Sequence, residues 1–341
     1  MTKRSAALLT VPVVQFGAGR RSFATHLSRT VTEGGVVIFL LAMIVAFSVT
    51  MPDTFFTVLN LQFILGAQAV PVIVALAVLA PLVAGEFDLS VGGTVGITAV
   101  YSAFAYGSNT PIPIVFVTTI LIGIVVGVVN GFLVTKIGVS AFIATLGMGT
   151  ILAGGNLLLS NGNVLYENIT ESVTKIAGAE VLGLPMVVYY AAIIALLFWY
   201  VLEWTPMGRY LRATGAGREA ARLTGVQTKQ WLFLSFVIAG ATAAIAGFLL
   251  TSREGSAPPT VGAAYVLPAY AAAFLGATTI HAGRFNVWGT VISVFVLAVG
   301  ITGLNLAGVA FWVPQVFNGV ALLVAVSFAV AASRRSNTQA S

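Results

Sequence analysis

The stretch QFILGAQAVPVIVALAVLAPLVAGEFDLSVGGTVG, residues 62–96, contains the pattern that decides the fold. Residues 62–84 are almost entirely apolar, and roughly 20 such residues are enough for a helix to cross a bilayer. Glu86 and Asp88 follow directly, and a second apolar segment begins at Val91. An ionised side chain at the centre of a bilayer costs about 2.5–3.5 kcal/mol on insertion scales. The two carboxylates therefore predict a turn, a wet cavity or a protein interface between two membrane helices.

The rest of the chain repeats this pattern of apolar segments and short polar breaks. Of its 341 residues, 58% are hydrophobic and 8% are charged, whereas about a quarter of the residues in a soluble domain are charged. The segments are long and lack the alternation of a membrane β-strand, so helices are expected. We predict an all-α polytopic membrane protein with about ten transmembrane helices, at residues 34–51, 62–84, 91–106, 113–134, 139–159, 183–203, 231–251, 266–280, 287–306 and 313–333.

The distribution of Lys and Arg predicts the orientation of these helices, because cytoplasmic loops retain positive charge. If the N-terminus is cytoplasmic, only Lys175 and Arg253 fall in outer loops, and the outer loop at residues 160–182 is acidic. The other basic residues all fall in cytoplasmic segments: Lys3, Arg4, Arg20, Arg21, Arg29, Lys136, Arg209, Arg212, Arg218, Arg222, Lys229, Arg284, Arg334 and Arg335. We therefore expect both termini to be cytoplasmic.

The polar ends of the chain are expected to be extensions of a single transmembrane domain, residues 34–333. Residues 1–33 are basic and lack the apolar core of a signal peptide, so they predict a cytoplasmic N-terminal arm. Residues 334–341 predict a frayed cytoplasmic tail. The loop at residues 204–230 is the longest predicted cytoplasmic segment between helices.

Composition and missing motifs argue against several functional classes. The net charge of +6 follows from the topology, so nucleic acid is not expected as a partner. Without cysteine, no disulfide or thiol chemistry is available. His26 and His281 lie far apart in polar segments and predict no metal site. The sequence has no G-x-x-x-x-G-K-[ST] phosphate loop and no hydrolase-like spacing of Ser, His and Asp, so we expect neither cofactor binding nor enzymatic activity in this chain.

Two further patterns concern the packing of helices. Gly123, Gly127 and Gly131 recur every four residues and predict a smooth helix face that another helix can approach closely. FDLSVGGTV at residues 87–95 and FNVWGTV at residues 285–291 form a faint repeat, each before a predicted helix. Internal duplication is common in transporters, although the similarity is also compatible with two unrelated turns.

The loop at residues 204–230 contains REAARLTG, residues 218–225, which predicts a short helix. Glu219, Ala220, Ala221 and Leu223 are compatible with a helix, and Gly225 suits its C-terminal cap. Arg218 and Arg222 share one face at this spacing. The residues alone leave two interpretations open, an amphipathic helix resting at the lipid interface or a docking element for a partner.

Several motifs resemble those of one transporter family. GRYLRATGAGREAARLTGV, residues 208–226, is similar to the cytoplasmic loop of ABC-transporter permeases, in which a glutamate-alanine-alanine element forms a coupling helix for the ATPase. EFDLSVGGTVG (86–96), VSAFIATLGMGTILAGGNLLLSNG (139–162) and GLNLAGVAFWVPQVFNGVALLVAV (303–326) resemble ribose-type sugar permeases, which are related to branched-chain amino acid permeases. The resemblance covers about residues 60–330.

The resemblance implies the membrane subunit of a bacterial inner-membrane importer. Such an importer contains two permease copies, here expected to be a homodimer in lipid, two ABC ATPase subunits and a periplasmic substrate-binding protein. ATP and magnesium would bind to the ATPase, and no cofactor to this chain. Glu219, Ala220, Ala221 and Gly225 would belong to the coupling element, in a helix that also contains Arg218 and Leu223. Asp88, Leu89, Ser90 and Gly92 match the other family signature, whereas Glu86 does not.

The carboxylate-bearing turn has two candidate roles. Asp88 or Ser90 is expected to cap the helix that begins near Val91, because helix N-termini favour an anion. Alternatively, a broken helix containing Glu86, Asp88 and Ser90 lines the translocation path. Polar residues in or near other spans are candidates for the same path or for bonds between helices: Asn130, Thr145, Asn156, Asn305, Gln315 and Asn318.

Three functions remain possible on this basis. A nearly charge-free path favours a neutral sugar, and an ATP-dependent sugar importer is the main prediction. A permease for another small polar solute, such as an amino acid or a nucleoside, is the alternative. An ATPase-independent carrier is the third possibility.

Overall fold

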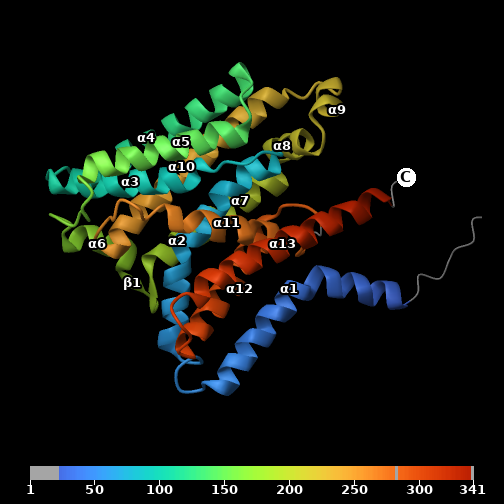
Figure 1. Ribbon diagram of the computed structural model, residues 1–341, viewed down its shortest axis with the longest axis horizontal. Coiled ribbons are helices and arrows are strands. Elements are labelled where there is room, and N and C mark those ends of the chain that lie inside the picture. Colours follow the sequence, from blue (N-terminus) through green and yellow to red (C-terminus); the bar gives the residue numbers. More distant parts are fainter. Residues whose placement is uncertain (1–22, 281–282, 339–341) are drawn as a thin grey trace, which may run out of the picture.

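The computed structural model describes residues 23–280 and 283–338 as a bundle of helices (Figure 1). The helices are α1 (Phe23–Thr50), α2 (Val58–Val83), α3 (Ser90–Gly107), α4 (Ile112–Phe132), α5 (Ala141–Ser160), α6 (Glu171–Gly178), α7 (Met186–Trp204), α8 (Pro206–Ala216), α9 (Arg218–Leu223), α10 (Thr228–Glu254), α11 (Ala263–Gly276), α12 (Val287–Leu306) and α13 (Val313–Thr338). A π-helical turn, η1 (Leu133–Ile137), continues α4, and β1 (Glu180–Val181) pairs antiparallel with β2 (Leu184–Pro185).

Each of the ten predicted apolar segments falls on one helix of this bundle. Among the described helices, six are long and apolar enough to cross a membrane: α2, α4 with η1, α5, α7, α10 and α12. Helices α1, α11 and α13 contain shorter apolar stretches, and α3 has 18 residues. The chain is therefore an all-α polytopic membrane protein.

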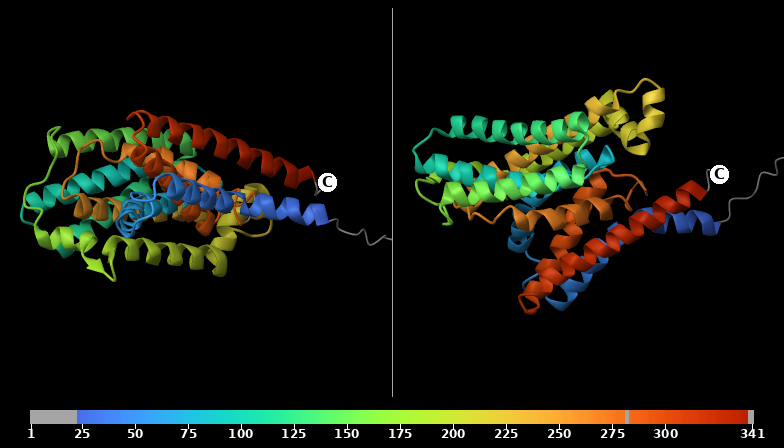
Figure 2. Two further views of the ribbon diagram at one scale, coloured as in Figure 1. Left: turned by 90° about the horizontal axis from the view of Figure 1, so that it is seen from below. Right: turned by 45° about the horizontal axis from the view of Figure 1, so that its top comes forward.

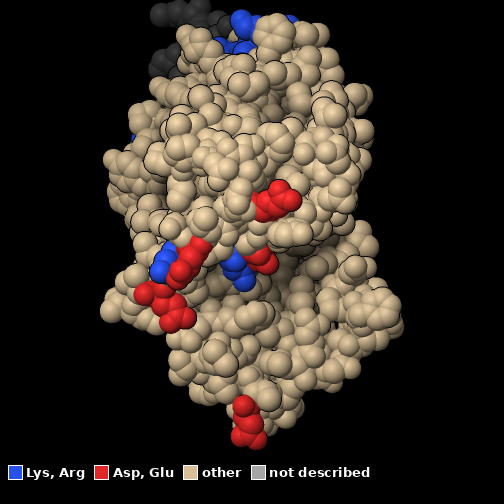
Figure 3. Space-filling model, turned by 90° about the vertical axis from the view of Figure 1, so that its left-hand side faces the viewer, with Lys and Arg blue, Asp and Glu red and all other residues tan. Residues whose placement is uncertain are grey.

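The bundle has two ends along its long axis, and each end contains different connecting segments. Figure 1 shows α8 and α9 at one end of the long axis, together with the ends of the described chain at Phe23 and Thr338. We call this the α9 end. Helix α6 and the short hairpin lie at the opposite end, the α6 end. Seen from the α6 end, acidic side chains are more prominent than basic ones (Figure 3).

Helix α2 occupies the centre of the bundle. About 72% of its most apolar window is buried inside the protein, against 22% for α5, so α2 packs on other helices where α5 largely faces outward. Its buried residues include Val70, Ile73, Leu76 and Leu79, all with less than 2% of their surface exposed. Because a membrane-facing surface is as apolar as the core, burial and not hydropathy distinguishes α2 from its neighbours.

The predicted glycine face on α4 is confirmed by its contact with α10. A Cβ atom on Gly123 would collide with the carbonyl group of Gly240, and one on Gly127 would collide with the backbone of Phe236 and Val237. The two backbones thus approach more closely than any larger side chain would permit. Figure 2 shows α4 and α5 on one side of the bundle and α1 and α13 on the other.

Three segments differ from the sequence-based predictions. The hairpin of β1 and β2 adds two short strands to a fold predicted to be entirely helical. Helix α1 begins at Phe23, inside the predicted arm at residues 1–33, whose first 22 residues lie outside the described part. Helix α13 continues to Thr338, so most of the predicted frayed tail at residues 334–341 is helical. Helix propagation beyond an apolar segment adds one hydrogen bond per residue, and hydropathy windows do not detect it.

Candidate functional site

The turn between α2 and α3, residues 84–89, lies at the α9 end of the bundle. Helix α2 ends in a Schellman motif: Gly85 has a positive φ of 84°, its N–H donates to Leu82 O, and the Glu86 N–H donates to Pro81 O. Glycine adopts this conformation without the strain that a Cβ atom introduces. The motif directs Glu86 away from the axis of α2, toward the loop that contains α8 and α9.

Asp88 binds the first residue of α3. Its Oδ1 accepts the N–H of Ser90 at 3.0 Å and the hydroxyl group of Ser90 at 2.6 Å. The residue is 1% exposed, and no described Lys or Arg lies within ion-pair distance of it. The Asp88 N–H donates to the hydroxyl oxygen of Tyr270 on α11 at 2.9 Å. The carboxylate thus bonds to the first residue of α3 from one position before the N-cap of the helix, which is Leu89.

Two of the candidate path residues bind this same turn. The side-chain amide of Asn130 on α4 donates to Ser90 Oγ at 2.7 Å, and Thr145 Oγ1 on α5 accepts the N–H of Leu89 at 3.0 Å. Asn130 and Thr145 are fully buried. Together these bonds connect the beginning of α3 to α4 and α5. In this conformation the two side chains bond to neighbouring helices.

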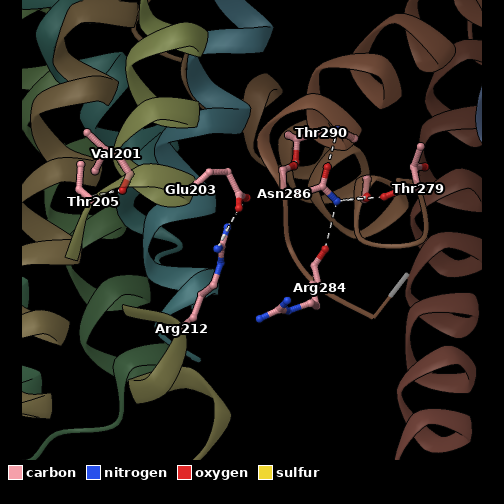
Figure 4. A network of polar contacts seen from close by, with 10 residues as sticks. Val201, Glu203, Thr205, Arg212, Thr279, Arg284, Asn286 and Thr290 are labelled. Carbon is pink, nitrogen blue, oxygen red and sulfur yellow. Dashed lines mark hydrogen bonds and ion pairs between the residues drawn. The ribbon is translucent and has the colours of Figure 1, made fainter. Parts of the chain in front are cut away.

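The second copy of the repeated motif precedes α12. Asn286 Oδ1 accepts the N–H of Gly289 at 2.7 Å, and its amide donates to Gly276 O and to Thr279 O, both at 3.0 Å. Figure 4 shows this network opposite the ion pair between Glu203 of α7 and Arg212 of α8. Asp88 and Asn286 occupy equivalent positions in the two repeated motifs. Asn286 is the N-cap of α12, whereas Asp88 lies one residue before the N-cap of α3, Leu89, and bonds to Ser90.

The two repeated motifs also approach one another through aromatic rings. The ring of Phe274 on α11 lies 6.1 Å from that of Phe87 and 5.4 Å from that of Phe285. Phe87 and Phe285 are the first residues of the two motifs. The repeat seen in the sequence thus corresponds to two similar turns on either side of Phe274.

The short helix predicted at residues 218–225 is present as α9. It ends in a Schellman motif, in which Gly225 has a φ of 87° and the N–H of Val226 donates to Ala221 O at 3.0 Å. Ala221 is 6% exposed and packs inward, whereas Leu223 is 90% exposed. A single exposed leucine is common on protein surfaces, so Leu223 gains significance only from its place in the predicted coupling helix.

Helix α9 touches the turn at residues 84–89. Arg218 Nη2 lies 2.6 Å from Glu86 Oε1 and forms an ion pair with it. Beside this pair, Gly215 packs against the backbone of the turn, because a Cβ atom on Gly215 would lie 3.0 Å from Gly85 N. The ion pair thus joins the turn before α3 to the predicted coupling helix, across 132 residues of sequence.

The remaining path candidates lie apart from this site. The Asn156 amide donates to Pro259 O at 3.1 Å, and Asn305 and Gln315 are exposed near the turn between α12 and α13. Asn318 lines a cavity of about 160 Å³ between α2, α11, α12 and α13. Its Oδ1 atom is buried without a hydrogen-bond partner, and Gln68, Tyr265 and Thr302 add polar groups to the same cavity.

Comparison with known proteins identifies the family. Residues 60–326 match the family described as the branched-chain amino acid transport system permease component. The chain belongs to this permease family. The permease is 32% identical to the ribose import permease protein of Haemophilus influenzae, over 88% of this chain and 94% of that protein. It is also 32% identical to the ribose import permease protein of Escherichia coli K12, over 91% and 96% of the two chains.

A more distant similarity links the permease to a further relative. It is 30% identical to the autoinducer 2 import system permease protein of Salmonella typhimurium, over 74% of this chain and 78% of that protein. No solved structure matches the permease significantly. With its apolar helices, the permease is a multi-pass protein of the bacterial inner membrane, in a family of transport subunits that are not enzymes.

Sequence reasoning missed several residues of this site. Tyr270 and Phe274 of α11 contact the turn at residues 84–89 without belonging to any recognised motif, and Gly215 of α8 lies in the quoted loop motif but has no predicted role there. Glu86 was noted as a carboxylate, but its partner Arg218 was assigned only to the helix of the loop. No local signal marks such contacts, because each joins segments far apart in the chain.

Proposed function

We propose that this permease is the membrane-spanning subunit of an ATP-binding-cassette importer that translocates a sugar by alternating access. The similarity to ribose import permeases over nearly the full length of both chains carries this proposal. The helices add a physical argument, because their polar groups are mostly amides and hydroxyls. Such groups bind sugar hydroxyls weakly enough to release them, whereas a fixed charge would hold an ion.

In the proposed topology the ten helices that contain the predicted spans all cross the membrane, including the shorter α3 and α11, and both termini are cytoplasmic. The basic side chains of the described loops support this orientation: Lys136, Arg209, Arg212, Arg218, Arg222, Lys229 and Arg284 belong to segments at the α9 end. Cytoplasmic loops are enriched in Lys and Arg. Trp199, Trp204 and Trp288 line a shallow cleft near the same end, as expected where a helix reaches the headgroups.

We assign the contact with the ATPase to α9. Its exposed side chains, Glu219, Ala220, Arg222 and Leu223, face away from the bundle at the proposed cytoplasmic end. ATP and magnesium would bind to two separate ATPase subunits, one beneath each of two permease copies. A periplasmic substrate-binding protein would dock at the opposite, more acidic α6 end.

The cavity beside Asn318 is the proposed position of the translocation path within one permease copy. The buried, unpaired amide oxygen of Asn318 at this partly open cavity favours a hydroxyl group or a water molecule as its partner. Gln68 and Thr302 provide further hydrogen-bonding groups, and no charged side chain lines this cavity.

Reconstitution tests the proposed function. Proteoliposomes containing the permease, its co-purifying ATPase subunits and its substrate-binding protein should accumulate a labelled pentose or hexose only with internal ATP. Unlabelled sugar should compete for uptake, and branched-chain amino acids and nucleosides should not. Uptake of an amino acid in place of sugar would refute the proposed substrate class. Uptake by the permease alone would instead identify an ATPase-independent carrier.

A further inference from the structure

The turn at residues 84–89 is held to the α8–α9 loop by two neighbouring contacts. One is the ion pair between Glu86 Oε1 and Arg218 Nη2, at 2.6 Å. The other is the backbone contact in which a Cβ atom on Gly85 would lie 3.1 Å from Gly215 Cα. Because glycine occupies both sides of this contact, no flexible side chain separates the two segments.

The same turn is bonded to the helices of the bundle. Immediately after Glu86, the ring of Phe87 lies against Phe274, the Asp88 N–H donates to the Tyr270 hydroxyl oxygen, and the Leu89 N–H donates to Thr145 Oγ1. A displacement of Glu86 would therefore reach α11 and α5 through the next residues of the chain. Energetic coupling between distant sites is carried by packed side chains and hydrogen-bond networks of this kind.

The charged residues of α9 differ in what they contact. Glu219 and Arg222 pair with one another at 3.5 Å, and both are largely exposed. Arg218 instead points toward the bundle and pairs with Glu86. In this pair 39% of the Arg218 side chain and 25% of the Glu86 side chain are exposed. Ion pairs with this much exposure contribute little to folding stability. A role in stability alone therefore does not explain why the Arg218 side chain points toward Glu86.

We propose that the Glu86–Arg218 ion pair transmits movement of α9 to the turn at residues 84–89, and through it to α3, α5 and α11. This inference rests on the proposed function, in which α9 docks on an ATPase subunit. Glu86 and Arg218 are positioning residues in this account, since neither touches ATP or substrate. Breaking the pair leaves α9 docked and leaves only the backbone contact between Gly85 and Gly215 to connect the loop with the turn, so movement of α9 reaches the helices less effectively.

The test compares single variants with a charge exchange in the complete reconstituted transporter. Glu86→Gln and Arg218→Gln each remove the pair, and Glu86→Arg combined with Arg218→Glu rebuilds it in reverse. The measured quantity is the number of substrate molecules transported per ATP hydrolysed. Glu203→Gln is the matched control, because it breaks the ion pair with Arg212 that joins α7 to α8 at the same end.

Each single variant should lower the ratio of transport to ATP hydrolysis by about fivefold or more, the lower end of typical coupling between two sites. The ATPase subunits should remain bound, the charge exchange should restore most of the ratio, and Glu203→Gln should leave it unchanged. Arg218→Lys keeps the charge and should retain an intermediate ratio.

Two results would overturn the inference while leaving the proposed function intact. One is an unchanged ratio in Glu86→Gln when the unmodified transporter couples ATP hydrolysis to uptake. The other is loss of assembly in Glu86→Gln with no rescue by the charge exchange, which would make the pair a purely structural contact. By contrast, a wild-type complex without ATP-dependent uptake would contradict the proposed function itself.

Discussion

The carboxylate of Asp88 accepts hydrogen bonds from the N–H and the hydroxyl of Ser90 at the buried start of α3. An asparagine side chain offers the same acceptor atom, so Asp88→Asn should retain folding and uptake. Asp88→Ala should lower the stability of the permease by about 0.5–2 kcal/mol, because it removes the acceptor of an N–H at the start of α3, as the loss of a helix cap does. Thermal unfolding in detergent measures the difference.

The control for this residue is Asp53→Ala, which removes an exposed carboxylate in the turn before α2. It should leave the unfolding temperature nearly unchanged. If Asp88→Asn assembles stably but no longer supports uptake, the negative charge itself is required and the capping interpretation is wrong.

At the scale of whole elements, α9 presents one strongly exposed leucine. Leu223→Glu should weaken binding of the ATPase subunits, because it places a charge where an apolar contact is expected, while the permease stays folded and inserted. Ala221 is unsuitable for this test, since it is buried and its replacement would disturb the loop itself. Co-purification of the ATPase measures the effect.

Leu182→Glu provides a matched control, because Leu182 is 92% exposed at the α6 end. The ATPase should co-purify normally with this variant. Equal ATPase recovery with both leucine variants would show that α9 is not the docking element.

The contact between α4 and α10 makes a second prediction about elements. Gly127→Ala should destabilise the permease, because the added methyl group meets the backbone of α10. Gly154→Ala on α5 should be neutral or stabilising by roughly 0.5–1 kcal/mol, since nothing lies within 4 Å of its Cβ position and alanine favours a helix. Thermal unfolding of the two variants gives a direct comparison, and similar losses in both would rule out close helix contact as the cause.

For the whole molecule, the proposed topology predicts which surfaces face the periplasm. The chain contains no cysteine, so single cysteines report their positions without background. Ser108→Cys, Asn163→Cys and Thr260→Cys lie on exposed turns at the α6 end and should react with an impermeant thiol reagent in intact cells. Ser140→Cys, between η1 and α5, should react only after the membrane is opened. Labelling of Ser140→Cys in intact cells would contradict the proposed orientation.

The features that could be predicted from the sequence depend on residues that are close together in the chain. Apolar segments are recognisable because a bilayer requires a fixed length, and α9 was predicted because a glycine cap and helix-forming residues lie side by side. The contact between Glu86 and Arg218 was not predicted, because 132 residues separate the two partners in the sequence. Amides and hydroxyls in a membrane helix can either line a translocation path or bond to another helix, so the sequence left both roles open for Asn130 and Thr145. The fold shows that these two side chains bond to Ser90 and Leu89 at the start of α3.

The backbone contact between α4 and α10 also has a mechanical consequence. Side chains in an ordinary helix interface can change rotamer, and so absorb small shifts between the helices. At Gly123, Gly127 and Gly240 there are no side chains to adjust, so this pair is stiff and should move as one body. Alternating access would then require hinges elsewhere. One candidate is the segment between α11 and α12, where Gly283 has a positive φ of 83° and nothing lies within 4 Å of its Cβ position.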